Sequence, residues 1–80
     1  MKPILYWKTR IGVFYIAQSA DGRFHPVFNE EDLGSYVAIH QAVDDLVNDA
    51  TFSVLHPQAF DLVDTSQLGL PEDPNEWEQA

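Results

Sequence analysis

The amino-acid sequence predicts an α+β fold: an antiparallel sheet of three to four strands packed on one amphipathic helix, with an ordered C-terminal extension. In the first third of the chain, apolar and aromatic runs alternate with turn-forming residues, as they do in strands and hairpins. The apolar period then changes to that of a helix. The last third keeps apolar residues that a disordered tail rarely retains. At 80 residues we expect one domain, with a core over residues 1–56 and an acidic extension over 57–80 that wraps it.

The strands are expected over residues 4–8, 11–18 and 23–28, with residues 33–36 as a further short strand. The segment 11–18 is the clearest, because it is rich in β-branched and aromatic residues. Residues 19–22 predict a turn in which Gly22 takes a positive φ. Pro26 cannot donate a hydrogen bond to a neighbouring strand, so its strand is placed at a sheet edge or given a bulge at this point.

One amphipathic helix is expected over residues 38–49. The apolar residues that recur at the spacing of one helix face are Ile39, Ala42, Val43, Leu46, Val47 and Ala50. The opposite face is polar and carries Asp44, Asp45 and Asp49. Ser35 is the nearest residue able to cap the start of this helix, and it lies early for that role.

Beyond the helix the pattern loosens. Residues 51–55 predict one more short strand, and residues 56–72 mix apolar anchors with turn formers. We interpret the second segment as ordered chain covering the core.

A short helical turn is expected near the end of the sequence. Asp73 suits the capping position, Pro74 the first helical position and Glu76 the third. Trp77 follows this turn. We interpret Trp77 as a packing residue, with a partner-binding hot spot as the alternative.

The formal net charge is −9, from 13 acidic and 4 basic residues, and it is unevenly distributed. Residues 1–20 contain three basic residues and no acid, so every acid lies further along the chain. Such a protein lacks the basic surface that binds nucleic acid, and anionic membranes repel it. The sequence has no cysteine, no evident targeting peptide and no membrane-spanning stretch. We therefore expect a cytoplasmic protein without disulfides or thiolate metal sites.

Two resemblances accompany this pattern. Strands followed by a helix, with LGSYVAIHQAVDDL at the junction, are similar to small β-β-β-α modules such as plant AP2-type DNA-binding domains and phage-integrase arm-binding domains. Those modules bind DNA through Arg and Lys on the sheet. Here the sheet offers at most Lys8, Arg10 and Arg23, so we do not expect that role. Residues 12–28, 33–48 and 64–77 resemble small bacterial proteins with an aromatic hairpin, an LGSY-helix segment and a tail similar to DTSQLGLPEDPNEW; this resemblance implies no assigned function.

No motif identifies a reaction. His40 and Asp44 lie four residues apart on the predicted helix, where a surface pair is the favoured interpretation and a shared metal the alternative. A Ser-His-Asp set can assemble in space without a sequence signature. The chain has no nucleophile elbow, and its size leaves little room for a water-excluding pocket. We therefore expect a protein that is not an enzyme and that binds no cofactor or metal.

The acidic residues suggest a binding function instead. Two groups are candidates for contact with a partner: Glu30, Glu31 and Asp32 in a predicted polar loop over residues 29–32, and Asp44, Asp45 and Asp49 on the helix. Carboxylates three or four residues apart on a helix lie about 5–6 Å apart and can imitate the charges of a phosphate backbone. The sequence therefore favours an acidic interaction module that binds a basic protein. Its sharpest form is an inhibitor of a nucleic-acid-binding protein, of the anti-restriction or anti-CRISPR type.

Two other interpretations stay open. The negative charge can serve solubility alone. Alternatively, a small housekeeping protein can act through a homodimer or a general protein–protein contact. In that case the contact is expected on the sheet face that carries Tyr15, opposite the face of Phe14 and Ile16.

Overall fold

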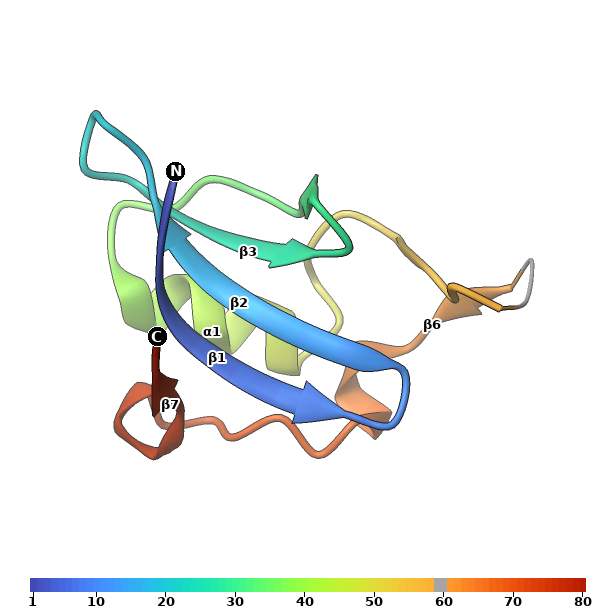
Figure 1. Cartoon of the computed structure of the whole chain (residues 1–80). Coiled ribbons are helices and arrows are strands. Elements are labelled where there is room, and N and C mark those ends of the chain that lie inside the picture. The colour runs from blue at the N-terminus through green and yellow to red at the C-terminus, as the bar shows by residue number, and fades with distance from the viewer. Residues whose placement is uncertain (59–60) are drawn as a thin grey trace.

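The computed structural model describes residues 1–58 and 61–80 and shows a small α+β fold (Figure 1). A five-stranded antiparallel sheet has the strand order β4-β3-β2-β1-β7. Its strands are β1 (Lys2–Thr9), β2 (Gly12–Gln18), β3 (Phe24–Phe28), β4 (Glu31–Asp32) and β7 (Glu78–Gln79). A separate two-stranded sheet, the β5–β6 arm, consists of β5 (Val54–Leu55) and β6 (Leu62–Val63). The helix α1 spans Ile39–Val47, and two 3-10 turns follow, η1 (Thr65–Gln67) and η2 (Pro74–Glu76).

Strand β2 is the centre of the sheet and pairs with β1 and β3, which confirms strands in the three predicted segments of the first half. Phe14 and Ile16 are fully buried, in one core with the apolar side of α1. The Phe14 ring stacks on Phe28, with ring centroids 4.4 Å apart. Gly22 takes a φ of 85° in the predicted turn between β2 and β3, and its N–H donates to the carbonyl of Ser19.

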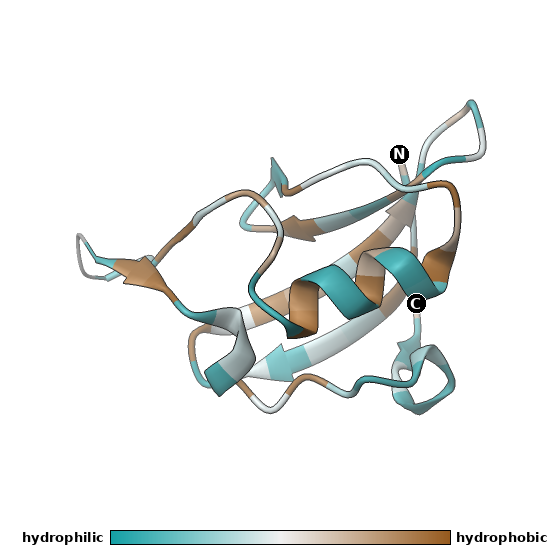
Figure 2. Cartoon of the chain, turned by 180° about the vertical axis from the view of Figure 1, so that it is seen from behind, coloured by the Kyte–Doolittle hydropathy of each residue, from teal (hydrophilic) through white to brown (hydrophobic). Residues whose placement is uncertain are grey.

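Helix α1 lies across one face of the sheet and turns its hydrophilic side outward (Figure 2). Its buried residues, Ala42, Val43 and Leu46, belong to the predicted apolar stripe. The helix begins after Ala38, which makes no side-chain capping hydrogen bond, and Ser35 does not cap it. Instead, Ser35 accepts hydrogen bonds from the Arg23 guanidinium, to its hydroxyl at 2.5 Å and to its carbonyl at 3.0 Å.

The helix ends at Val47, two residues before the predicted end, because Asp49 adopts a left-handed conformation with a φ of 57°. The Ala50 N–H donates to the carbonyl of Asp45 at 2.8 Å, and the Asp49 N–H donates to that of Leu46 at 3.3 Å. This pair of bonds is a Schellman motif, in which glycine is the usual residue at the left-handed position.

The prediction of a strand over residues 33–36 is wrong. Tyr36 makes one isolated bridge to Phe24, with N–H to carbonyl bonds of 2.8 Å in both directions. Gly34 bends the segment with a φ of 154°, and a Cβ atom there would lie 2.8 Å from the Tyr36 ring. The glycine of the LGSY segment thus permits the Tyr36 ring to pack directly on the backbone.

The edge strand β4, next to β3, comes from the acidic segment 29–32, where a loop was expected. Phe28 pairs with Glu31 across the two-residue turn Asn29-Glu30, and both turn residues have a positive φ, 53° and 68°. This is the pattern of a type I′ hairpin turn. Two two-residue strands, β4 and β7, bring the sheet to five strands where three to four were expected.

Pro26 lies within a paired strand, with β2 on one side and β4 beside only the last two residues of β3. Its carbonyl accepts a hydrogen bond from the Leu33 N–H at 2.8 Å on the β4 side. The backbone N and carbonyl of one strand residue point to the same side of the strand. The N–H that Pro26 lacks would therefore lie on the β4 side of β3, where few backbone hydrogen bonds are made.

The strand predicted over residues 51–55 is reduced to Val54–Leu55, and it pairs with β6 rather than with the main sheet. Val54 is buried in the core, whereas Leu55 is 50% exposed and Leu62, directly opposite, is 69% exposed. The β5–β6 arm therefore carries two exposed leucines, and its strand β6 is coloured brown, as hydrophobic, in Figure 2.

The last part of the chain contributes to the same core through Leu68, Leu70 and Trp77. Asp73 caps η2 by accepting a hydrogen bond from the Asn75 N–H at 2.9 Å, which confirms the predicted cap. Trp77 is 4% exposed and its indole N–H donates to the Pro71 carbonyl at 2.9 Å, which confirms it as a packing residue. The chain then pairs with β1 as β7.

Candidate functional site

The six acidic residues predicted to contact a partner differ in how far the fold already uses them. Glu30, Glu31 and Asp44 are exposed. Asp32, Asp45 and Asp49 each interact with a neighbouring element of the fold. Each of the two predicted acidic groups therefore combines carboxylates that face solvent with carboxylates that the fold already uses.

Asp32 belongs to a hydrogen-bonded chain that also contains His25 and Ser19. Its carboxylate oxygens lie 3.0 and 3.1 Å from His25 Nδ1, and it also accepts from the Gly34 N–H at 3.0 Å. The other ring nitrogen, Nε2, lies 3.1 Å from the Ser19 hydroxyl. This series of hydrogen-bonded side chains links the turn after β2 to β4 across β3.

Asp32, His25 and Ser19 are connected in the same order as the members of a catalytic triad. The sequence analysis allowed for such a set but assigned no residues to it. Here the single hydroxyl hydrogen of Ser19 has a carboxylate as its nearest acceptor, Asp21 Oδ1. That hydrogen bond, together with the one from the Arg23 N–H, lowers the pKa of Asp21. With its hydroxyl hydrogen directed to Asp21, Ser19 is not arranged to yield that proton to His25.

Asp49 fastens the polypeptide after the β5–β6 arm to the end of α1. Its Oδ1 accepts a hydrogen bond from the Thr65 N–H at 3.2 Å. The Thr65 side chain is 1% exposed, and its hydroxyl lies within hydrogen-bonding distance of the Leu46 carbonyl and of Asp49 Oδ1. The Asp49 carboxylate thus has partners within the fold.

On the helix itself, Asp45 is half-buried beside Tyr36. Burial, with a further contribution from the Asp45 carboxylate, raises the pKa of Tyr36 to about 12. Asp44 is exposed and accepts a hydrogen bond from the Asn48 side chain at 3.3 Å.

The basic residues do little to neutralise the acids. Among residues 1–58 and 61–80, the one contact with the geometry of an ion pair joins His25 Nδ1 and the Asp32 carboxylate at 3.0 Å, and no Lys or Arg takes part in one. Arg10 donates to the Gln67 carbonyl at 3.0 Å, and Arg23 donates to Ser35. Both arginines are therefore engaged by neutral acceptors, which leaves most of the negative charge facing solvent.

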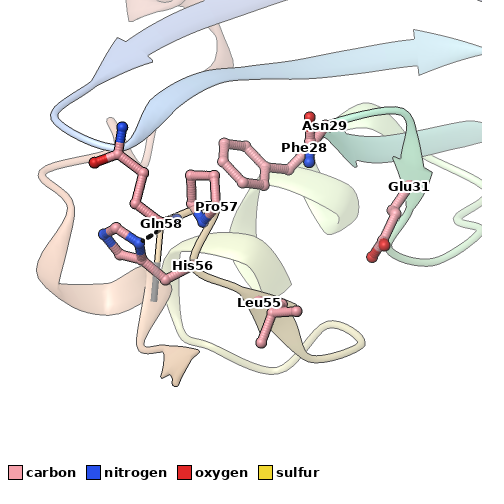
Figure 3. A pocket seen from close by; sticks show the side chains of 7 residues that line it. All are labelled: Phe28, Asn29, Glu31, Leu55, His56, Pro57 and Gln58. Atoms are coloured by element: carbon pink, nitrogen blue, oxygen red, sulfur yellow. Dashed lines mark hydrogen bonds between the residues drawn. The ribbon is translucent and has the colours of Figure 1, made fainter. Parts of the chain in front are cut away.

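A cleft of about 260 Å³ lies between the β3–β4 turn and the start of the β5–β6 arm (Figure 3). Phe28 and Pro57 point toward one another in it, and Glu31 lies on its outer side (Figure 3). A second hollow of about 370 Å³ shares Phe28, Asn29 and Pro57 with it. We call the two together the Pro57 groove; its apolar and aromatic residues are Ile11, Val13, Tyr15, Phe28, Leu55 and Pro57, and its acidic residues are Glu30 and Glu31.

His56 supplies a polar group beside the Pro57 groove. Its Nδ1 accepts a hydrogen bond from the Gln58 N–H at 3.0 Å, drawn as a dashed line in Figure 3. A neutral imidazole that accepts at Nδ1 carries its hydrogen on Nε2. The ring therefore offers a donor at Nε2.

Sequence reasoning placed Glu30 and Glu31 together in a loop, whereas Glu30 lies in the turn and Glu31 begins β4, and it did not identify the groove beside them. Phe28 and Leu55 were interpreted only as strand residues, and Pro57 fell in a stretch without a clear period. The available signal was Asn29, a residue that favours type I′ turns and so indicates a tight hairpin at this point.

The described residues contain no cluster of three His, Asp or Glu side chains arranged to hold a metal ion. His40 and Asp44 are both exposed on α1. Within the same part of the chain, no helix is long and apolar enough to cross a membrane. In comparisons with known proteins, no family model, curated protein or solved structure matches the chain at a significant level.

Proposed function

We propose that this protein is a non-enzymatic, cytoplasmic interaction module that binds a basic site on another protein, in the manner of an inhibitor that imitates nucleic-acid charge. The observation that carries this proposal is the lack of internal neutralisation. The net charge is −9, and the one ion pair within the described residues uses a histidine. Uncompensated surface charge attracts an oppositely charged partner over about 10 Å at moderate ionic strength.

The most available carboxylates in this proposal are those of Glu30, Glu31 and Asp44, because they are exposed and, within the described residues, accept no hydrogen bond from another element of the fold. Asp32, Asp45 and Asp49 would add to the negative electrostatic potential around the protein while keeping their contacts within the fold. The Ser19–His25–Asp32 chain supports the non-enzymatic part of the proposal, since the Ser19 hydroxyl has Asp21 as its nearest acceptor.

Competition with DNA tests this function directly. A fluorescent, arginine-rich peptide from a DNA-binding protein would be titrated with this protein, with and without duplex DNA. We expect binding that duplex DNA displaces, because both ligands would occupy the same basic residues. Binding that is indifferent to DNA would contradict charge mimicry, and no binding at low salt would contradict the basic partner itself.

The second candidate function is self-association through the sheet face opposite α1. Tyr15 on that face is 37% exposed and lines a hollow of about 370 Å³ with Met1, Pro3, Ala17 and Val27. A dimer through this face would be detected by light scattering over a concentration series, and Tyr15→Lys would abolish it. A monomer at every concentration would exclude this candidate.

A further inference from the structure

We propose that the Pro57 groove is the specific docking site for the basic partner, and that it accepts an extended segment with one large apolar side chain flanked by Lys or Arg. This inference rests on the proposed function and adds the location of the contact and the chemistry of the segment. It differs from charge attraction alone because it requires an apolar anchor.

The size and lining of the groove indicate the anchor. Its two hollows, of about 260 and 370 Å³, share Phe28, Asn29 and Pro57 in their lining. The first volume lies below the range of about 300–1,000 Å³ that is typical of small-molecule pockets and the second lies near its lower end, so each hollow is of a size to hold one large side chain. Phe28 is 5% exposed and forms a fixed floor, because its ring also stacks on Phe14 in the core.

The charge at the edge of the groove indicates what flanks the anchor. Glu30 and Glu31 are both exposed, and each lines one of the two hollows. No Lys or Arg lines either hollow. An apolar side chain seated in the groove would therefore have carboxylates beside it, which complements Lys or Arg at neighbouring positions of the same segment.

The hairpin turn holds these carboxylates in place. Asn29 and Glu30 are the central residues of a two-residue turn, and β4 continues it directly with Glu31. A tight turn restricts the backbone more than a long loop does, so less conformational entropy is lost when a partner binds.

A peptide with the sequence Lys-Lys-Phe-Lys-Lys, blocked at both ends, is the probe for this site. Binding would be followed by amide chemical shifts at low salt, with expected changes at Asn29, Glu30, Glu31, Leu55 and Gln58. Replacing the central Phe by Ala should weaken binding about tenfold, because one buried aromatic side chain is lost. Equal binding of the Phe and Ala peptides would overturn the apolar anchor.

Matched variants locate the contact. Glu30→Gln with Glu31→Gln should weaken the Phe peptide about threefold to tenfold at low salt. The control Glu72→Gln with Glu76→Gln removes the same charge from exposed positions in the tail and should change binding less than twofold. Leu55→Ala should reduce the preference for Phe over Ala about threefold, whereas Leu62→Ala, its exposed cross-strand neighbour, should not.

The failure of this inference can be told apart from that of the proposed function. If the peptide binds with undiminished affinity to the Glu30/Glu31 variant but loses affinity in Asp44→Asn, the groove is wrong and the acidic function stands. If affinity responds to neither salt nor any charge variant, both fall. Shift changes at the groove that already appear on concentrating the peptide-free protein would identify a second copy of this chain as the occupant and overturn the inference.

Discussion

The carboxylate of Asp49, just beyond the end of α1, accepts a hydrogen bond from the backbone N–H of Thr65 at 3.2 Å. The same aspartate occupies the left-handed position of the helix-terminating motif, with a φ of 57°. It therefore ends the helix and anchors the chain that returns from the β5–β6 arm. Asp49, which sequence reasoning assigned to an acidic binding face, therefore stabilises the fold.

This relationship predicts a graded series of stabilities. Asp49→Asn keeps an acceptor and tolerates the left-handed backbone, so it should cost less than about 1 kcal/mol. Asp49→Ala loses the acceptor and adds the backbone penalty, for a loss of about 2–3 kcal/mol. Asp49→Gly loses only the acceptor and should fall between them. Chemical denaturation measures the series, and an alanine variant as stable as the asparagine variant would contradict the anchor.

The second prediction concerns alkaline pH. The pKa of Tyr36 is about 12 in the fold against 10.0 in an unfolded chain, so the folded state holds this proton more tightly. Its stabilising effect is complete below about pH 10 and is lost as the pH rises toward about 12. An alkaline titration of phenolate absorbance should therefore show a late step that Tyr36→Phe removes.

Asp45 is the matched test of the cause. Asp45→Asn should lower the pKa of Tyr36 part of the way toward its ordinary value, since the neighbouring charge disappears while burial remains. Asp44→Asn, at the adjacent exposed position, should leave the late step where it is. A titration in which all three tyrosines ionise together in the unaltered protein would refute this account.

The third prediction concerns Ser19 and Asp21. The Ser19 hydroxyl and the Arg23 N–H lower the pKa of Asp21. Ser19→Ala removes the larger of these causes, so the pKa of Asp21 should rise toward 3.8. Because the folded-state value is lowered, this carboxylate stabilises the fold above the unfolded pKa, and the effect disappears as the pH falls through the folded value. Carboxyl-carbon shifts in an acid titration report the change, and an unaltered Asp21 titration in Ser19→Ala would be the contrary result.

The fourth prediction separates stability from binding at the β3–β4 turn. Glu30 has a φ of 68°, which costs a non-glycine residue about 1 kcal/mol. Glu30→Gly should therefore stabilise the protein by about 0.5–1 kcal/mol while weakening the binding of a basic segment. Glu30→Gln, which keeps the backbone penalty, should weaken binding without that gain. A destabilised glycine variant would show that the turn does not carry this strain.

The elements that sequence reasoning predicted are those specified by many residues of one chain segment. The apolar stripe through Ala42, Val43 and Leu46 is sufficient to define α1, and the aromatic content of residues 11–18 defines β2. Strands β4 and β7 have two residues each and consist of Glu, Asp and Gln, residue types that carry little strand signal of their own. They pair because the turn at Asn29-Glu30 and the packing of Trp77 bring them beside existing strands.

The candidate site shows the same division. Glu30 and Glu31 are exposed in and directly after the hairpin turn, as expected for charged residues in an acidic polar segment. The role of Asp49 was not predictable, because its partner Thr65 lies 16 residues away. The Pro57 groove brings together three separate segments, the turns after β1 and β3 and the start of the β5–β6 arm, and no local pattern records that meeting.

The central claim is that surface carboxylates left unneutralised by the fold bind a basic partner, and salt titration tests it most directly. The affinity for an arginine-rich peptide would be measured over a range of NaCl concentrations for three proteins: the unaltered chain, a variant with Glu30→Gln, Glu31→Gln and Asp44→Asn, and a control of equal charge with Glu72→Gln, Glu76→Gln and Glu78→Gln. We predict that affinity falls with salt and that the first variant binds about fivefold or more weakly than the control at low salt. Equal affinities and equal salt slopes for the two variants would contradict the claim.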